Sequence, residues 1–386
     1  MPTHDLPRPR ASVLDLPAYV AGRRAESELT AALASNESHH PPLPAVLDVL
    51  AHSSASVNRY PDPSATALRE RLAETLGVSV DETVVGPGST GVLQQIVTSL
   101  CDPGDEVVFA WRSFEAYPIL TRLAGAVPVP VPLLADEGHD LDAMAAAVTE
   151  RTRVVLLCSP NNPTGVSLGA EAVERFLQRV PSSVLVVIDE AYVEYSEGGA
   201  AGRVDSIALF HRHPNVCVLR TFSKAYGLAG LRVGYAVAAP VVADGLRRSG
   251  MPFAVSALAQ RAALVSLTAE ASTQMRARVA EVVAERGRVV AVLRDRGWRV
   301  PDSSANFVWL RMPDAAREAL VELLAAHHIL VRGYPGDGVR ISLADRASND
   351  RVLAVLAGLD PHAIQTTDAP AAVPAAGEPS AAEVLA

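Results

Sequence analysis

The sequence LRTFSKAYGLAGLRVGYA, residues 219–236, is the stretch around which the rest of the chain is organised. It begins with a short β-type run and then breaks into small polar residues and glycines, which let a backbone turn tightly and approach a ligand. Lys224 lies between the hydroxyls of Thr221 and Ser223, and no other lysine follows it. With Arg232 eight positions on, the pattern suits a Schiff-base lysine beside a phosphate, although a Ser-Lys pair also occurs in solvated turns.

The composition is that of a large globular protein. At 386 residues with 49% hydrophobic content, we expect two domains and a large buried interior. The net charge of −9 argues against a nucleic-acid surface. The three cysteines are too far apart for CxxC metal or redox pairs, and such a sparse set is typical of a reducing compartment. With neither a signal-peptide core nor a run of about 20 apolar residues, we expect a cytoplasmic protein that avoids membranes.

Short apolar runs alternate with helical patterns through the middle of the chain. The runs lie at residues 83–85, 106–110, 127–131, 153–157, 184–188, 216–219 and 233–238. Helical patterns such as 92–100, 141–148 and 170–180 lie between most of them. Continuous Val/Ile/Leu runs separated by helices predict an α/β domain with a mostly parallel sheet covered on both faces.

A second set of patterns follows, and it predicts a smaller α+β domain. A long helical pattern at about 256–296 precedes apolar runs at 307–310, 329–331 and 339–343, and helical patterns at 314–326 and 347–359. The predicted organisation is an N-terminal arm (1–35), a large domain (36–255), a small C-terminal domain (256–360) and a disordered Ala/Pro-rich tail (361–386).

The segment GPGSTG, residues 86–91, matches GxGxxG between a predicted strand and a predicted helix. A dinucleotide site also needs an acidic residue at the end of the next strand, but Asp105 and Glu106 precede that strand. The weaker prediction is a phosphate bound at a helix N-terminus by backbone N–H groups and the hydroxyls of Ser89 and Thr90. A tight strand-to-helix turn is the alternative.

Two further segments place polar side chains after predicted strands. SPNNPTG, residues 159–165, offers the Asn162 amide at the sheet edge where ligands bind, although Asn-Pro and Thr-Gly are also ordinary turn residues. VLVVIDEAYVEY, residues 184–195, places Asp189 at the end of the most hydrophobic strand and Tyr192 three positions later. A buried carboxylate needs a partner, which a protonated pyridinium nitrogen would supply; a helix N-cap is the alternative.

Together these groups form the inventory that pyridoxal phosphate needs, with Phe114 in WRSFEAYP as an aromatic face. The chain resembles a fold-type I pyridoxal-phosphate aminotransferase of the histidinol-phosphate aminotransferase family from Leu14 to about residue 358. The resemblance runs in order through YVAG, LASNE, NRYPD, GPGST, SPNNPTG, IDEAYVEY, TFSKAYGLAGLRVGY, SANFVWL and GVRIS. WRSFEAYP, TFSKAYGLAGLR and ANFVWL are most similar to the phenylalanine (aromatic amino acid) aminotransferase branch.

The resemblance implies pyridoxal 5'-phosphate as cofactor, no metal, and a set of roles around the cofactor ring. Lys224 becomes the Schiff-base lysine, Asp189 pairs with the pyridine nitrogen, and both are expected to be catalytic, as is Tyr192. Asn162 and Tyr192 hold the ring oxygen, and Phe114 stacks on the ring. The expected phosphate ligands are Ser89, Thr90, Thr221, Ser223 and Arg232.

The resemblance also implies how substrate and subunits are arranged. Arg340 in GVRIS is expected to grip the substrate carboxylate, and Arg332, Tyr19 and Asn36 to line the substrate side. Tyr60 is expected to reach the phosphate of a neighbouring subunit, so that a homodimer with the N-terminal arm completes each site. Two positions depart from the family pattern: Ser159 replaces the usual asparagine, and Gly333 replaces the proline usual in the branch.

We therefore expect an aminotransferase that moves the amino group of an aromatic L-amino acid of the phenylalanine type to 2-oxoglutarate, in a ping-pong mechanism. Histidinol-phosphate aminotransferase is the alternative within the family, and a decarboxylase of the same fold has no specific support. From other classes, an NAD-dependent oxidoreductase rests only on GPGSTG. A non-catalytic binding module gives no reason for a lysine between two hydroxyls.

Overall fold

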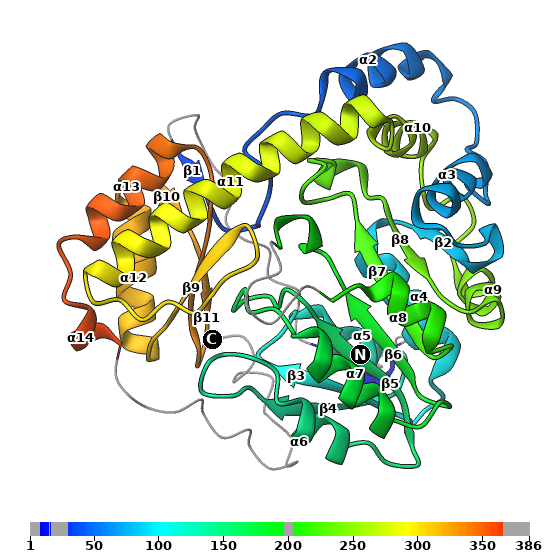
Figure 1. Cartoon of the computed structure of the whole chain (residues 1–386), viewed down its shortest axis with the longest axis horizontal. Coiled ribbons are helices and arrows are strands. Elements are labelled where there is room, and N and C mark those ends of the chain that lie inside the picture. The colour runs from blue at the N-terminus through cyan, green and yellow to red at the C-terminus, as the bar shows by residue number, and fades with distance from the viewer. Residues whose placement is uncertain (1–7, 15, 17–29, 197–203, 366–386) are drawn as a thin grey trace, which may run out of the picture.

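The computed structural model describes residues 8–14, 16, 30–196 and 204–365 (Figure 1). The larger of its two main sheets has seven strands in the order β2-β8-β7-β6-β5-β3-β4. The strands are β2 (Thr83–Gly86), β3 (Glu106–Trp111), β4 (Val127–Pro132), β5 (Thr152–Cys158), β6 (Leu185–Asp189), β7 (Val216–Thr221) and β8 (Gly234–Val237). β8 is antiparallel to β2 and β7, and the other pairings are parallel, which confirms the predicted mostly parallel sheet.

Side chains of the central strand β6 alternate between two buried clusters, because successive side chains of a strand point to opposite faces. Leu185 and Val187 belong to one cluster, and Val186 and Ile188 to the other. The first cluster is completed by α4 (Gly88–Leu100), α5 (Ala116–Leu123) and α9 (Pro240–Ser249). The second is completed by α6 (Leu141–Ala146), α7 (Ala170–Arg179) and α8 (Ser206–Arg212). Burial on both faces explains the uninterrupted apolar runs in the sequence.

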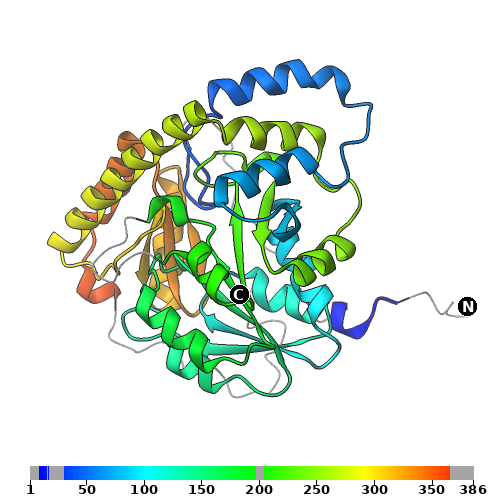
Figure 2. The same cartoon turned by 45° about the vertical axis from the view of Figure 1, so that its right-hand side comes forward.

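The smaller sheet has three antiparallel strands in the order β11-β12-β9. They are β9 (Phe307–Arg311), β11 (Arg332–Tyr334) and β12 (Gly338–Ser342). Figures 1 and 2 show α11 (Ala269–Asp295), α12 (Asp314–Ala326) and α13 (Arg346–Leu356) gathered on one side of this sheet, as expected for an α+β domain. The strand β11 was not predicted, because a three-residue strand with a central glycine carries no apolar run.

The predicted single helical pattern at 256–296 is two helices. α10 (Ala257–Ser266) ends before Thr268, whose side chain accepts a hydrogen bond from the Ala271 N–H and caps α11. Such a cap satisfies an N–H group that the start of a helix leaves without a partner. α10 packs against α2 (Pro44–Ser53) and α3 (Thr66–Leu76), and α11 then carries the chain toward the small sheet (Figure 1).

The end of the predicted arm joins the small domain. β1 (Ala31–Ala32) pairs in parallel with β10 (Ile329–Leu330), and the Ser342 N–H donates to the Leu33 carbonyl. At the other end, α14 (Pro361–Ile364) lies inside the segment predicted as a tail, whose residues 366–386 lie outside the described residues. The remaining short elements are α1 (Ala11–Leu14), η1 (Ser54–Ser56), η2 (Val80–Glu82), η3 (Val193–Tyr195) and η4 (Ala229–Leu231). None of the helices in the described ranges combines the length and apolar character needed to cross a bilayer.

Candidate active site

Lys224 lies in the loop that follows β7, at the carboxyl edge of the large sheet. Its Nζ donates to the Ser35 carbonyl at 2.9 Å and lies 5.8 Å from the centroid of the Tyr192 ring. Burial and the positive charges of Arg340 and Arg232 lower the pKa of Lys224 to about 7. A large fraction of the amine is therefore neutral at physiological pH, as a nucleophile requires. The 386-residue sequence contains no other lysine.

Asp189 is the last residue of β6, the strand beside β7, and its carboxylate is buried. The Tyr117 hydroxyl donates to Oδ2 at 2.8 Å, and the Ala191 N–H donates to Oδ1 at 3.3 Å. Within the described residues, no cationic side chain forms an ion pair with this carboxylate. Burial consequently raises the pKa of Asp189 to about 6, although both hydrogen bonds act in the opposite direction. A cationic ligand at this edge would relieve the cost of burying the charge.

Asn36 connects this edge to the small domain. It has a φ of 54°, a left-handed conformation that asparagine tolerates better than most residues. Its Nδ2 donates to the Tyr192 hydroxyl at 2.9 Å, and its Oδ1 accepts the Ser342 hydroxyl at 2.8 Å. The Asn306 side chain in turn donates to the Asn36 carbonyl at 3.1 Å. The direct role of Asn36 in this structure is therefore to position the hydroxyl of Tyr192, the phenol expected beside the cofactor ring.

Arg340 lies in the middle of β12 and is buried. Its Nη1 donates to Asn162 Oδ1 and, at 2.7 Å, to the Tyr334 hydroxyl, while Nη2 donates to the Ala34 carbonyl at 2.6 Å. Its Nε–H is buried without an acceptor in the described part of the chain. Because buried N–H groups are almost always paired, this position favours a bound acceptor such as a carboxylate.

The predicted phosphate-binding side chains meet at the start of α4. Arg232 donates from Nη1 to the Ser223 hydroxyl at 3.3 Å, and Thr221 donates to the same hydroxyl at 3.0 Å. Gly88 has a φ of 76°, which favours glycine, and a side-chain carbon there would also meet the Arg232 guanidinium, so the glycine lets the helix start lie against this arginine. Ser89 and Thr90 follow in the first turn of α4, whose free N–H groups suit an anion.

The sequence also predicted that Phe114 supplies an aromatic face. Phe114 lies beside Tyr117, whose hydroxyl donates to the Asp189 carboxylate. The Phe114 and Tyr117 rings meet edge to face with centroids 5.7 Å apart. Tyr117 itself was missed by sequence reasoning. Its only signal is its position three residues after Phe114 in WRSFEAYP, and nothing in that spacing indicates a contact with Asp189, 72 positions away.

Other predicted residues have different surroundings. Tyr60 is 84% exposed and lies against Phe253, with ring centroids 4.7 Å apart, so within this chain it lies outside the group around Lys224. Tyr19 lies outside the described residues. Ser159, the first departure from the family pattern, accepts the Leu168 N–H at 3.0 Å. Gly333, the second, lies in the middle of β11.

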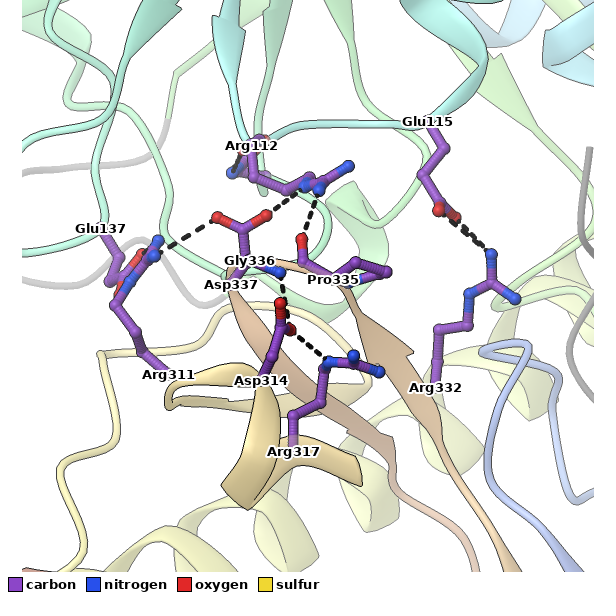
Figure 3. Close-up of polar contacts among 11 residues, drawn as sticks. Arg112, Glu115, Glu137, Arg311, Asp314, Arg317, Arg332, Pro335, Gly336 and Asp337 are labelled. Atoms are coloured by element: carbon purple, nitrogen blue, oxygen red, sulfur yellow. Dashed lines mark hydrogen bonds and ion pairs between the residues drawn. The ribbon is translucent and has the colours of Figure 1, made fainter. Parts of the chain in front are cut away.

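Arg332 was expected to line the substrate side. In the structure it belongs to a set of polar contacts between the two domains, which the sequence did not predict (Figure 3). Arg112 donates from Nε to Asp337 Oδ2 at 2.6 Å, and Arg311 pairs with Glu137. These partners lie far apart in sequence, so no local pattern predicts them. Their large-domain members are Arg112, Glu115 and Glu137, and their small-domain members are Arg311, Arg332, Pro335 and Asp337.

Residues 30–356 match the family described as aminotransferase class I and II, and the chain belongs to that family. Among curated relatives, an aromatic amino acid aminotransferase of Rhodococcus jostii is 51% identical over 90% of this chain and 95% of its own. One of Streptomyces avermitilis is 49% identical over 90% and 96%. The resemblance to the aromatic branch is thereby confirmed.

A comparison with solved structures supports the family and the fold. A histidinol-phosphate aminotransferase of Sinorhizobium meliloti in complex with pyridoxal-5'-phosphate has a TM-score of 0.83 at 29% identity, covering 92% of this chain and 98% of its own. The fold is therefore that of the fold-type I enzymes, and the chain is a pyridoxal-phosphate-dependent transaminase.

The buried carboxylate gives a pH-dependent prediction for the cofactor-free protein. Because the pKa of Asp189 is raised to about 6, protonated Asp189 stabilises the fold fully below about pH 4, and this contribution is lost as pH rises through 6. Between pH 5 and pH 8, Asp189→Asn should therefore gain about 1–2 kcal/mol in unfolding free energy relative to wild type. Urea unfolding of both proteins at pH 5 and pH 8 measures this difference in unfolding free energy.

Tyr117→Phe is the companion variant. Removing the donor that lowers the pKa of Asp189 should make stability fall more steeply over the same pH range. Curves for wild type and Asp189→Asn that run parallel from pH 5 to pH 8 would contradict the assignment of an uncompensated carboxylate.

Proposed function

We propose that this chain transfers the amino group of an aromatic L-amino acid of the phenylalanine type to 2-oxoglutarate, in two half-reactions of a ping-pong mechanism. The relatives at about half identity, which are named aromatic amino acid aminotransferases, support this substrate class. Two groups at one sheet edge carry the proposal: the partly neutral amine of Lys224, in the loop after β7, and the buried carboxylate of Asp189 at the end of the neighbouring β6, which pairs with no cationic side chain of the described residues.

The residues fit pyridoxal phosphate. Asp189 suits a protonated ring nitrogen, because that cation would supply the charge missing from its surroundings. The Thr221 and Ser223 hydroxyls, Arg232 and the start of α4 suit the phosphate group. Phe114 offers a ring face, and the Lys224 amine suits the aldehyde. When bound, the cofactor supplies an electron sink for negative charge on the substrate α-carbon.

Lys224 is the proton carrier in this proposal. An amine with a pKa near 7 can accept a proton from the α-carbon of the amino donor and release it again, because both of its protonation states are populated at neutral pH. Asp189 would hold a proton on the ring nitrogen, and the Tyr117 hydroxyl orients the carboxylate for that role. Tyr192, positioned by Asn36, would donate to the ring oxygen together with Asn162.

Arg340 is proposed to bind the carboxylate shared by all amino and 2-oxo acid substrates. Its Nε–H has no acceptor among the residues that the structure describes, and its Nη groups are already oriented by Asn162, Tyr334 and Ala34. A guanidinium held in one orientation loses little freedom when it binds a planar carboxylate. Burial also strengthens the resulting charged hydrogen bonds.

The substrate assignment is tested with a panel of amino donors at fixed 2-oxoglutarate. We expect kcat/KM for phenylalanine to exceed that for histidinol phosphate by at least about tenfold, and Lys224→Ala to lower turnover about 10²–10⁴-fold by removing the proton carrier. In the absence of an oxo acid, phenylalanine should yield one equivalent of phenylpyruvate per site. A preference for histidinol phosphate would instead support histidinol-phosphate aminotransferase, the activity named for several structural neighbours.

The charges near Lys224 predict how cofactor capture depends on pH. Only the neutral amine attacks an aldehyde, so capture by the cofactor-free protein should accelerate as pH rises through about 7. Arg340→Gln removes a charge that lowers the pKa of Lys224, and the midpoint should move to higher pH. Stopped-flow absorbance of pyridoxal phosphate measures the capture rate at each pH and hence this midpoint. Arg340→Lys keeps the charge and is the control; equal midpoints for all three proteins would contradict the assignment.

We further propose that a second copy of the chain covers the exposed side of Tyr60. Tyr60, Phe253, Met251 and Val57 are exposed apolar or aromatic side chains on neighbouring segments. In a homodimer, the Tyr60 hydroxyl would reach the partner's phosphate site, with the N-terminal arm alongside. Mixing inactive Lys224→Ala and Tyr60→Ala subunits should then restore part of the activity, because one site of each hybrid is intact. A fully active monomer in sedimentation analysis would contradict this.

A further inference from the structure

Glu115 and Arg332 form an ion pair across the boundary between the two domains (Figure 3). Both carboxylate oxygens of Glu115 accept from Nη2 of Arg332 at 3.0 Å. The side chains are 25% and 14% exposed, so water screens the pair only in part. Glu115 lies just before α5 in the large domain, and Arg332 begins β11 in the small one.

Both ends of this ion pair adjoin groups of the active site. Arg332 lies opposite Arg340 in the register of β11 and β12. The two guanidinium groups lie 5.7 and 5.5 Å from the centroid of one ring, that of Tyr334, whose hydroxyl accepts from Arg340. Glu115 directly follows Phe114, the ring that lies against the Tyr117 donor of Asp189. The ion pair therefore lies beside the proposed substrate-carboxylate arginine and the proposed cofactor face.

An arginine in this position would attract a second negative charge on a substrate, such as the side-chain carboxylate of a dicarboxylic amino acid. In this protein Glu115 already forms an ion pair with that arginine. A substrate with an acidic side chain must displace Glu115 to reach Arg332, which leaves a partly buried carboxylate unpaired beside another negative charge. A substrate with an uncharged aromatic side chain leaves the ion pair intact and meets no such cost.

We infer that Glu115 is a specificity-determining residue, which neutralises Arg332 and thereby selects against substrates whose side chains are negatively charged. The inference rests on the proposed function, since it concerns which amino and oxo acids this site accepts. It also implies that 2-oxoglutarate, the proposed acceptor, binds at the expense of the Glu115–Arg332 pair.

The test compares two competitive inhibitors on the holoenzyme: glutarate, with two carboxylates, and 3-phenylpropionate, with one carboxylate and an aromatic ring. In Glu115→Gln, Arg332 loses its charged partner, and we expect the inhibition constant of glutarate to fall roughly tenfold. That of 3-phenylpropionate should change by less than about twofold, because its side chain does not compete for Arg332. The double variant Glu115→Gln/Arg332→Gln should lose the gain for glutarate.

Glu137→Gln is the matched control. Glu137 pairs with Arg311 across the same domain boundary, but Arg311 contacts Asp337 and does not lie over Tyr334. If the Glu115 pair only holds the domains together, both single variants should shift both inhibitors alike, and this result would overturn the inference. So would an unchanged glutarate constant in Glu115→Gln, or a gain that survives without Arg332.

The wild-type donor panel keeps this test separate from the proposed function. If wild type fails to use phenylalanine, the proposed aromatic substrate class fails, whereas the two inhibitors still decide whether Glu115 neutralises Arg332. If wild type uses phenylalanine and the inhibitor constants do not diverge in Glu115→Gln, the specificity inference alone fails.

Discussion

The Asp189 carboxylate is buried at the end of β6, and no cationic side chain of the described segments pairs with it; the other groups of the site are arranged around this constraint. Two neutral donors, the Tyr117 hydroxyl and the Ala191 N–H, form hydrogen bonds to the buried carboxylate of Asp189. They offset the cost of burial only in part, because the pKa of this acid remains raised to about 6. A bound cation would relieve that cost, and the protonated ring nitrogen of the proposed cofactor is such a cation. Because β6 and β7 are parallel neighbours, the loop with Lys224 follows β7 at the same sheet edge, where the proposed cofactor would meet both the acid and the amine.

The small domain completes the site through hydrogen bonds to residues distant in sequence. Asn36 joins Tyr192 to Ser342, and Arg340 joins Asn162 to the Ala34 carbonyl. Under the proposed function the two sheets divide the site: the residues proposed to hold the cofactor follow strands of the large sheet, whereas the buried guanidinium proposed to bind a substrate carboxylate comes from β12. The charged contacts of Figure 3 hold the end of β9, β11 and the turn before β12 against the large domain through Arg311, Arg332 and Asp337. One of these contacts pairs Arg332 with Glu115.

The sequence predicted well those features that local patterns encode. All seven strands of the large sheet were found, because burial on both faces leaves continuous apolar runs, and the polar residues ending β6 and β7 followed from them. The helix break at Thr268 and the short strand β11 were missed, since a single cap and a three-residue strand leave little pattern. Tyr117 and the pairing of Arg332 with Glu115 were also missed. Such contacts join residues far apart in sequence, and only the folded arrangement of the sheets and loops determines them.

The most direct measurement locates the covalent attachment of the cofactor. The holoenzyme is reduced with borohydride, digested, and its peptides are mapped by mass spectrometry. Because Lys224 is the sole lysine of the sequence, we predict that the phosphopyridoxyl mass is found on the peptide containing TFSKAYGLAGLR and nowhere else. Asp189→Asn should weaken cofactor retention without moving the label. An active enzyme that carries the label only on its N-terminal amine, or carries none, would contradict this prediction.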